Sequence, residues 1–383
     1  MSRKLLPVSI TTALLGSAAV ADAPNVAVDI APVHSLVARV MEGVGTPDLI
    51  VPPGASPHEY NLRPSEAAAL QNADLVFWLG EELTPWMAGA VETLAEGATV
   101  TTLLDSDGTV LLDFREGALF EAHDHDDEDD HGDEDHAGHD SHDHEDEHGD
   151  DDHTDHDHEE HAKDKDHDHG DDHSKDEEHA HDDGHDDHVD GDDHDHEKHA
   201  EHEGGDGHDD HGHGAHDPHA WLSPENAGVW LNLIAAQLSS ADPENAGAYF
   251  ANAATAREEM DGLSAEVSAM LEPARGGSFI VFHDAYQYFE NTFDFPASGA
   301  ISLSDASDPS PARIAEIQSR IRDEGIDCVL AEPQFNQGII TTVLDGTKAN
   351  TGVIDPLGSD LEPGPALYPQ LIRNMAETLA GCL

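Results

Sequence analysis

Apolar runs and helical patterns alternate through the first part of the chain. Runs rich in Val, Ile and Leu are typical of strands buried on both faces, and the segments between them have the spacing of amphipathic helices. This alternation predicts a parallel sheet that is covered by helices on both faces. The expected strands are 25–30, 49–51, 75–79 and 99–103, and the expected helices are 33–41, 64–72 and 84–94.

The same alternation returns in the last part of the chain. Short apolar runs again precede segments with helical spacing, which predicts a second lobe of the same α/β class. The expected strands are 278–282, 328–331 and 352–354, and the expected helices are 311–324, 338–348 and 369–383.

A long helical pattern lies between these two parts, after a shorter helix over 224–238. It begins with Asp242 as a cap and Pro243 at the first helical position, and no breaker follows before Pro273. At 1.5 Å per residue it would span about 40 Å, more than a small domain needs. We therefore expect a rigid linking helix over 242–272. It would join an N-terminal α/β lobe, made of 22–120 and 218–241, to a C-terminal α/β lobe over 273–383.

Residues 121–217, called the insert below, interrupt the pattern with almost no aliphatic or aromatic side chains. They hold 45 of the 83 acidic residues, 27 of the 31 histidines and only four of the 16 lysines and arginines. Such a segment cannot bury enough apolar surface to offset the entropy lost on ordering. We therefore predict that the insert is disordered.

The formal charge of −67 excludes two classes of function. Of this charge, −41 comes from the insert, which has 45 acidic side chains against four basic ones. Binding to nucleic acid or to an anionic membrane surface needs clustered Lys and Arg, and 16 basic residues cannot outweigh 83 carboxylates. We expect neither kind of partner.

The N-terminal segment has the layout of a cleavable secretory signal. Arg3 and Lys4 precede an apolar stretch over 5–20 that ends in small residues. The stretch is short for a membrane span and contains Pro7 and Gly16, so an uncleaved anchor is only the alternative. We expect a signal peptide over 1–21 and an exported, soluble protein.

Cys328 and Cys382 are the two cysteines of the chain. In an oxidising compartment a lone pair usually forms a disulfide, whereas a cysteine metal site needs more sulfur ligands or nearby histidines. We predict a disulfide that ties the last helix to the C-terminal lobe. Two buried free thiols are the alternative.

Three of the four histidines outside the insert are candidate metal ligands. His58 follows the strand 49–51 and its breaker, His283 directly follows the strand 278–282, and His219 lies in the turn where the helical pattern resumes. Ligand sites of open α/β sheets lie outside the carboxyl ends of the strands. Three imidazoles with one carboxylate or water suit tetrahedral Zn²⁺.

The fourth ligand stays open at this point. Asp355 directly follows the expected strand 352–354 and is the first candidate, while Glu59, next to His58, and a water molecule are the alternatives. His34 also follows a strand, and we consider it for the rim of the pocket or for a place behind the ligands, bonded to one of them.

Four motifs resemble those of the ZnuA family of zinc-binding proteins, which are periplasmic substrate-binding components of ABC importers. They are GASPHEY at 54–60 with RPS at 63–65, DPHAWLSP at 217–224, HDAY at 283–286 and EPQ at 332–334. The resemblance covers essentially the whole chain after the signal segment. It implies two α/β lobes joined by a long helix, with zinc held between them by His58, His219 and His283.

The resemblance also implies partners and a compartment. A periplasmic monomer would deliver zinc to the permease of an ABC importer, and it could receive zinc from periplasmic chaperones. Related manganese-binding members have a carboxylate where this chain has His283, which favours zinc, and the Cys328–Cys382 disulfide suits the zinc-binding branch. Some zinc-binding members carry an acidic residue where this chain has Pro57, so the fourth ligand must come from elsewhere.

Recurring His-Asp-His motifs suggest that the insert collects zinc at many weak sites. The alternative is an acidic linker that merely tolerates metal. Two other functions remain open: a periplasmic zinc buffer that meets no transporter, and a zinc hydrolase with Glu59 or Asp284 as its base. The auxiliary weak ligands are His123, His125, His142, His144, His156, His158, His167, His169, His194 and His196.

Overall fold

The computed structural model describes residues 23–115, 117, 120, 216–302 and 309–383. The expected signal peptide over 1–21, nearly all of the insert and its ten auxiliary histidines lie outside these residues. The predictions made for those segments therefore stay predictions.

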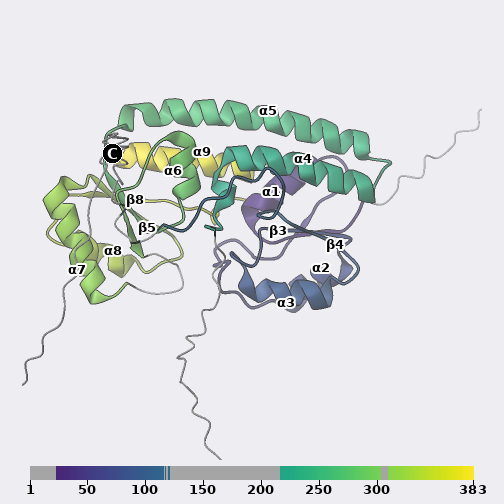
Figure 1. Cartoon of the computed structure of the whole chain (residues 1–383), viewed down its shortest axis with the longest axis horizontal. Helices are drawn as coiled ribbons and strands as arrows, with labels where there is room; N and C mark the ends of the chain where they lie inside the picture. The colour runs from purple at the N-terminus through teal and green to yellow at the C-terminus, as the bar shows by residue number, and fades with distance from the viewer. Residues whose placement is uncertain (1–22, 116, 118–119, 121–215, 303–308) are drawn as a thin grey trace, which may run out of the picture. The chain divides into compact units, whose positions relative to one another are not determined.

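The first sheet has four parallel strands in the order β2-β1-β3-β4. Each strand was expected, although each is shorter than the apolar run that predicted it. Figure 1 shows β3 and β4 of this sheet between α1 and α4 on one side and α2 and α3 on the other. The strands are β1 (Val26–Val28), β2 (Asp48–Leu49), β3 (Leu75–Trp78) and β4 (Thr99–Thr102).

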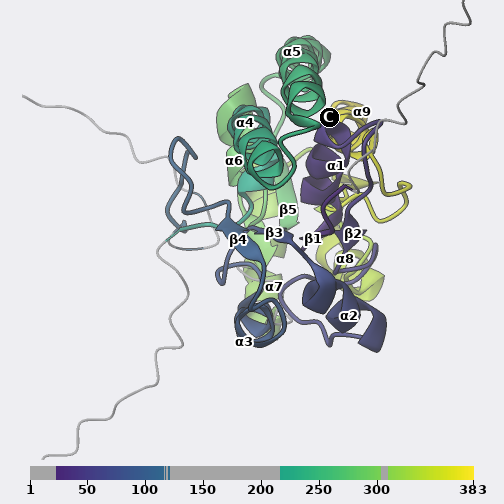
Figure 2. The ribbon, with the colours of Figure 1, turned by 90° about the vertical axis from the view of Figure 1, so that its right-hand side faces the viewer.

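Helices cover both faces of this sheet, as predicted (Figure 2). Val28 and Phe77 face α1 and α4, while Ala27 and Val76 face α2 and α3. Both sets are fully buried, which explains why the strands read as continuous apolar runs rather than alternating ones. The helices are α1 (Ala31–Val40), α2 (Pro64–Asn72), α3 (Pro85–Leu94) and α4 (Pro224–Ala241), with the 3₁₀ turn η1 (Ala220–Leu222) before α4.

The second sheet repeats this design with strand order β6-β5-β7-β8, again all parallel. Its strands are β5 (Phe279–His283), β6 (Ala300–Ser302), β7 (Cys328–Ala331) and β8 (Asn350–Val353). Its helices are α6 (Gln287–Phe293), α7 (Pro311–Arg320), α8 (Gln337–Leu344) and α9 (Leu367–Cys382), with η3 (Ile321–Gly325) extending α7.

Two elements of the second lobe were not predicted. The strand β6 has three residues and the helix α6 has seven, so neither is long enough to show a clear period in the sequence. The helix α6 nevertheless matters for the site, because it follows the loop after His283 directly.

The linking helix is α5 (Ala246–Leu271), followed by η2 (Glu272–Ala274). It begins four residues later than expected, because Asp242 accepts hydrogen bonds from the Asn245 amide and the Tyr249 hydroxyl and so closes a turn before the helix. Its 26 residues span about 39 Å. Figure 1 shows α5 running above elements of both sheets. Among the described residues, none of the helices combines the length and the apolar composition needed to span a bilayer.

One continuous apolar core lies between the two sheets on one side and α4, α5 and α9 on the other. The face of each sheet that is turned toward α5 contributes to it, and α5, α4 and α9 supply the opposing side chains. Rotation of one sheet against the other would therefore open apolar surface to water. Members from the different elements include Val28, Phe77, Trp230, Leu263, Val281, Leu330 and Met375.

His216 and Asp217, which the sequence analysis placed at the end of the insert, both contact the described part of the N-terminal lobe. Asp113 and His216 form an isolated antiparallel bridge, and the Asp217 amide donates to the Leu112 carbonyl at 2.8 Å. Asp217 is 1% exposed. Composition suggested otherwise, because an aspartate beside a run of His and Asp looks like part of that run.

Arg115 forms a buried ion-pair group with two carboxylates of the second lobe. It donates to Asp284 and, at 2.7 Å, to Glu290 on α6. The three side chains are 18%, 8% and 5% exposed. Burial raises the pKa of both carboxyl groups, and Arg115 opposes this shift. The group therefore holds the loop that follows His283 against the segment that precedes the insert.

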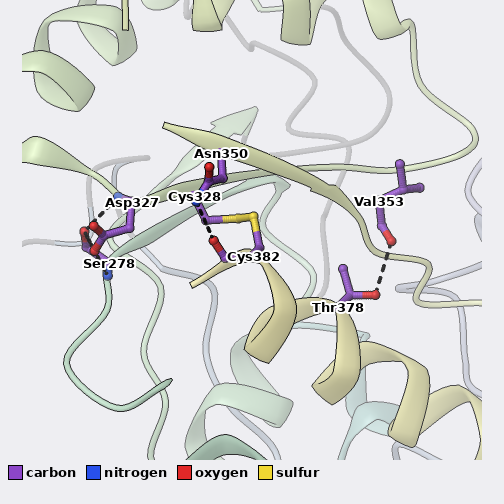
Figure 3. The surroundings of a disulfide bond; sticks show 7 residues. All are labelled: Ser278, Asp327, Cys328, Asn350, Val353, Thr378 and Cys382. Carbon is purple, nitrogen blue, oxygen red and sulfur yellow. Dashed lines mark hydrogen bonds between the residues drawn. A yellow bond between two sulfur atoms is a disulfide. The ribbon is translucent and has the colours of Figure 1, made fainter. Parts of the chain in front are cut away.

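The predicted disulfide between Cys328 and Cys382 is confirmed (Figure 3). It joins β7 to the end of α9, and the Asn350 side chain donates to the Cys382 carbonyl at 3.0 Å beside it. Cys328 pairs with Phe279 at the beginning of β5, the end opposite to His283. The disulfide thus anchors α9 without approaching the candidate ligands.

Replacing both cysteines with alanine should lower stability and leave metal binding unchanged. The disulfide closes a sequence separation of 54 residues, which corresponds to about 4 kcal/mol in the free energy of unfolding. Urea unfolding of the double variant should match that of the reduced wild type. A variant as stable as the oxidised wild type would contradict this role.

Arg115→Met should destabilise the protein in a pH-dependent way. Removing the cation leaves two buried carboxylates unpaired, which should cost about 3–5 kcal/mol near neutral pH. Their folded-state pKa values then rise further, so the folded state binds more protons than the unfolded state, and stability is lost as the pH rises.

Urea unfolding near pH 7.5 and near pH 5 measures this effect, with the larger loss expected at the higher pH. Arg373→Met is the matched control, because Arg373 forms an exposed ion pair with Glu266 that should contribute less than about 1 kcal/mol. An equal loss at both pH values would show that Arg115 does not act through these carboxylates.

Candidate metal centre

The three histidines expected as ligands line one small cavity. The cavity volume open to the centre of a water molecule is about 10 Å³. This is room for a single small occupant. The ring centroids of His58 and His219 lie 5.6 Å apart, and those of His219 and His283 lie 5.3 Å apart. The described lining residues are Pro57, His58, His219, Trp221, His283, Gln334, Pro356 and Leu357.

His283 is positioned by strand register. It ends β5, and because β5 and β7 run parallel with Phe279 opposite Cys328, the residue after β7 that lies beside His283 is Glu332. The Nδ1 of His283 lies 2.6 Å from Glu332 Oε1, and Glu332 is fully buried. A carboxylate only accepts, so Nδ1 carries the proton and Nε2 keeps its lone pair.

His219 is held in the same way from a different part of the chain. Its Nδ1 lies 2.7 Å from Asp217 Oδ1, and the same oxygen accepts from the His219 amide at 2.9 Å. The Tyr288 hydroxyl donates to the Asp217 carbonyl and fixes the turn. Burial raises the pKa of Asp217 to about 7, against the lowering by the His219 amide and Arg115. Because Asp217 accepts the proton on His219 Nδ1, the lone pair of the ring lies on Nε2.

His58 lies in the loop between β2 and α2. Contacts with α2 and α3 hold this loop in place. The Trp86 indole on α3 donates to the Pro57 carbonyl at 2.7 Å. The Tyr60 hydroxyl donates to Glu66 on α2 at 2.8 Å. These bonds fix the backbone on both sides of His58 and bring its half-buried ring to the cavity.

Neither carboxylate that was considered as the fourth ligand lines the cavity among the described residues. Asp355 accepts from the amides of Leu357, Gly358 and Ser359 at 2.9, 3.0 and 2.6 Å, so its two oxygens close a turn. Glu59 is exposed. β8 ends at Val353, two residues before Asp355 and not directly before it as expected, and backbone amides that the sequence does not reveal bind the Asp355 carboxylate.

His34 lies on α1, and its Nε2 is 3.0 Å from the Pro47 carbonyl. Its side chain is buried, and this burial lowers its pKa. It is not among the described lining residues, so the suggested place at the rim of the pocket is corrected. His34 instead joins α1 to the segment before β2.

The spacing of the three imidazole rings fits one tetrahedral zinc ion, although the side chains as they lie do not form a complete ligand set. As the side chains lie, no three His, Cys, Asp or Glu residues within the described ranges form a group that could hold a metal ion. With Zn–N distances of about 2 Å, two imidazoles on one tetrahedral ion have centroids about 5 Å apart, close to the observed separations. Rotation of the rings about their side-chain torsions would bring the nitrogens onto one ion without movement of the backbone.

Sequence reasoning missed three residues of the site. Asp217, Glu332 and Gln334 were noticed only as members of motifs, without a role, and Asp217 was also counted as the end of the insert. Strand register could have identified Glu332, since it is the first residue after β7, as His283 is the last residue of the neighbouring β5.

The chain is similar to known proteins over nearly its whole length. The family model described as zinc-uptake complex component A, periplasmic, matches residues 26–382. The high-affinity zinc uptake system protein ZnuA of Brucella abortus (strain 2308) is 43% identical over 368 residues, covering 96% of this chain and 94% of the relative. That of Paracoccus denitrificans (strain Pd 1222) is 38% identical over 378 residues, covering 98% and 97%.

The fold matches as well. A solved crystal structure of ZnuA superposes with a TM-score of 0.61 and 17% sequence identity, covering 94% of this chain and 99% of that one. At that identity the likeness supports the two-lobed α/β fold alone. The family model and the relatives extend over nearly the whole chain, and this chain therefore belongs to the ZnuA family of periplasmic zinc-uptake components.

Proposed function

We propose that this protein captures Zn²⁺ in the periplasm, between His58, His219 and His283, and delivers it to the permease of an ABC importer. The observation that carries the proposal is the convergence of three imidazoles on a cavity with room for one small occupant. Two of them have Nδ1 bonded to a buried carboxylate, the usual arrangement of histidine metal ligands.

The donor set favours zinc over harder divalent ions. Imidazole nitrogen suits zinc, whereas manganese, magnesium and calcium prefer carboxylate and carbonyl oxygen. The carboxylates of Asp217 and Glu332 bond to the Nδ1 atoms of His219 and His283. Neither acidic residue is among the described residues that line the cavity. They make the imidazoles better donors while leaving nitrogen as the main ligand type.

A binding role fits the site better than a zinc hydrolase. Of the two bases considered for hydrolysis, Asp284 is paired with Arg115, and Glu59 is exposed and lies off the cavity lining. Membership of a zinc-uptake family supports transport rather than a zinc buffer that meets no transporter. Under this proposal the permease receives the zinc ion. Transfer of zinc from periplasmic chaperones to this protein stays a prediction, and so does its monomeric state.

The insert would serve as a zinc collector next to this cavity. It leads directly into His216 and Asp217, and Asp217 contacts His219, so the insert is joined to the chain two residues before a proposed ligand. Many weak sites on a tethered segment raise the local concentration of the ion. The ten auxiliary histidines would supply those sites.

Zinc titration by calorimetry should separate one tight site from many weak ones. Deleting 125–208 keeps Asp113 and the 216–219 turn, and should leave one tight site. In the full chain, His58→Ala, His219→Ala and His283→Ala should each weaken the tight site by more than about 100-fold, because loss of a ligand's hydrogen-bonding partner alone costs 10- to 100-fold.

His216→Ala is the matched control. His216 is 41% exposed, contacts Asp113 and does not line the cavity, so tight binding should stay unchanged. If all three ligand substitutions left the tight site intact, or if the deletion abolished it, the proposed function would be wrong.

A further inference from the structure

We propose that Gln334 supplies the oxygen donor on the fourth side of the zinc ion. This inference rests on the proposed function, and it assigns the position for which Asp355, Glu59 or water were the candidates. It depends on how one buried carboxylate orients two neighbouring side chains.

Glu332 binds both His283 and Gln334. Its Oε1 accepts from His283 Nδ1 at 2.6 Å, and its Oε2 accepts from Gln334 Nε2 at 2.8 Å. Because an ionised carboxylate can only accept, the NH₂ group of the amide must face Glu332. The orientation of the amide is therefore fixed, and Gln334 Oε1 points away from Glu332.

The amide oxygen of Gln334 that faces away from Glu332 is buried, and the residue lines the cavity of the three imidazoles. Gln334 lines the same cavity as His58, His219 and His283. Its Oε1 is buried and has no hydrogen-bond partner among the described residues. A buried acceptor without a partner is costly, and a cation in the cavity would satisfy it. Glu332 thus orients both His283 and Gln334, two of the residues that line this cavity.

An amide oxygen also fits the charge of the site. Three neutral imidazoles and a neutral amide would contact the ion, while the negative charges of Asp217 and Glu332 remain one hydrogen bond away. A set with three nitrogens and a single uncharged oxygen disfavours manganese, which prefers oxygen ligands. Gln334 would then contribute to the selectivity of the site as well as to its affinity.

Three variants of the full chain test this assignment, with a chelator present that masks the weak sites of the insert. Gln334→Ala should weaken the tight zinc site at least 10-fold and alter the visible absorption of bound Co²⁺. Gln334→Glu restores an oxygen at the same place, so it should bind at least as tightly as wild type. Gln337→Ala is the control, since Gln337 is exposed and donates only to the Glu332 backbone carbonyl.

Two outcomes would overturn the assignment. Binding and Co²⁺ spectrum of Gln334→Ala within twofold of wild type would show that Oε1 does not meet the ion. Weaker binding by Gln334→Glu than by Gln334→Ala would show that the residue only holds Glu332, since a second carboxylate there repels the first. A wild type without a tight site, or a tight site that survives His283→Ala, would instead reject the proposed function.

Discussion

The rest of the structure depends on the continuous apolar core that both sheets share with α4, α5 and α9. Side chains from β1, β3, β5 and β7 pack through it against α4, α5 and α9. Since separating the sheets would expose this core to water, apolar packing holds the two sheets together. A site made of residues from both lobes can then be set by packing before any ion arrives.

Within that frame, buried carboxylates set the chemistry of the cavity. Glu332 reaches His283 because two parallel strands end in register, and Asp217 reaches His219 because a tight turn follows the insert. Both carboxylates fix which ring nitrogen carries the proton. Most of the acidic excess of the chain lies in the insert, whereas the polar side chains that line the cavity are three imidazoles, one amide and the Trp221 indole.

The sequence was sufficient for the parts that follow from periodicity. Continuous apolar runs identified the parallel strands, and the run that ends at His283 placed that residue at the edge of a sheet. The long pattern identified α5, with an error at its start that arose because Asp242 caps a turn and not the helix itself. The convergence of His58 with His219 and His283 needed the tertiary fold, although motif resemblance had already suggested it.

What the sequence could not supply was the set of hydrogen-bond partners. Asp355 and His283 carry the same strand-end signal, yet three backbone amides bind the first and a carboxylate orients the second. Asp217 was hidden by the composition of its neighbours, although it is among the most buried polar residues. Short elements such as α6 and β6 carry too little pattern to be read at all.

The central claim is that one zinc ion is held by three imidazoles and one oxygen. X-ray absorption at the zinc K-edge, on protein that lacks 125–208 and carries one equivalent of zinc, measures this ligand set directly. The account predicts the scattering pattern of three histidine rings with a single oxygen ligand at about 2 Å. A spectrum with at most one imidazole, or with oxygen ligands only, would contradict it.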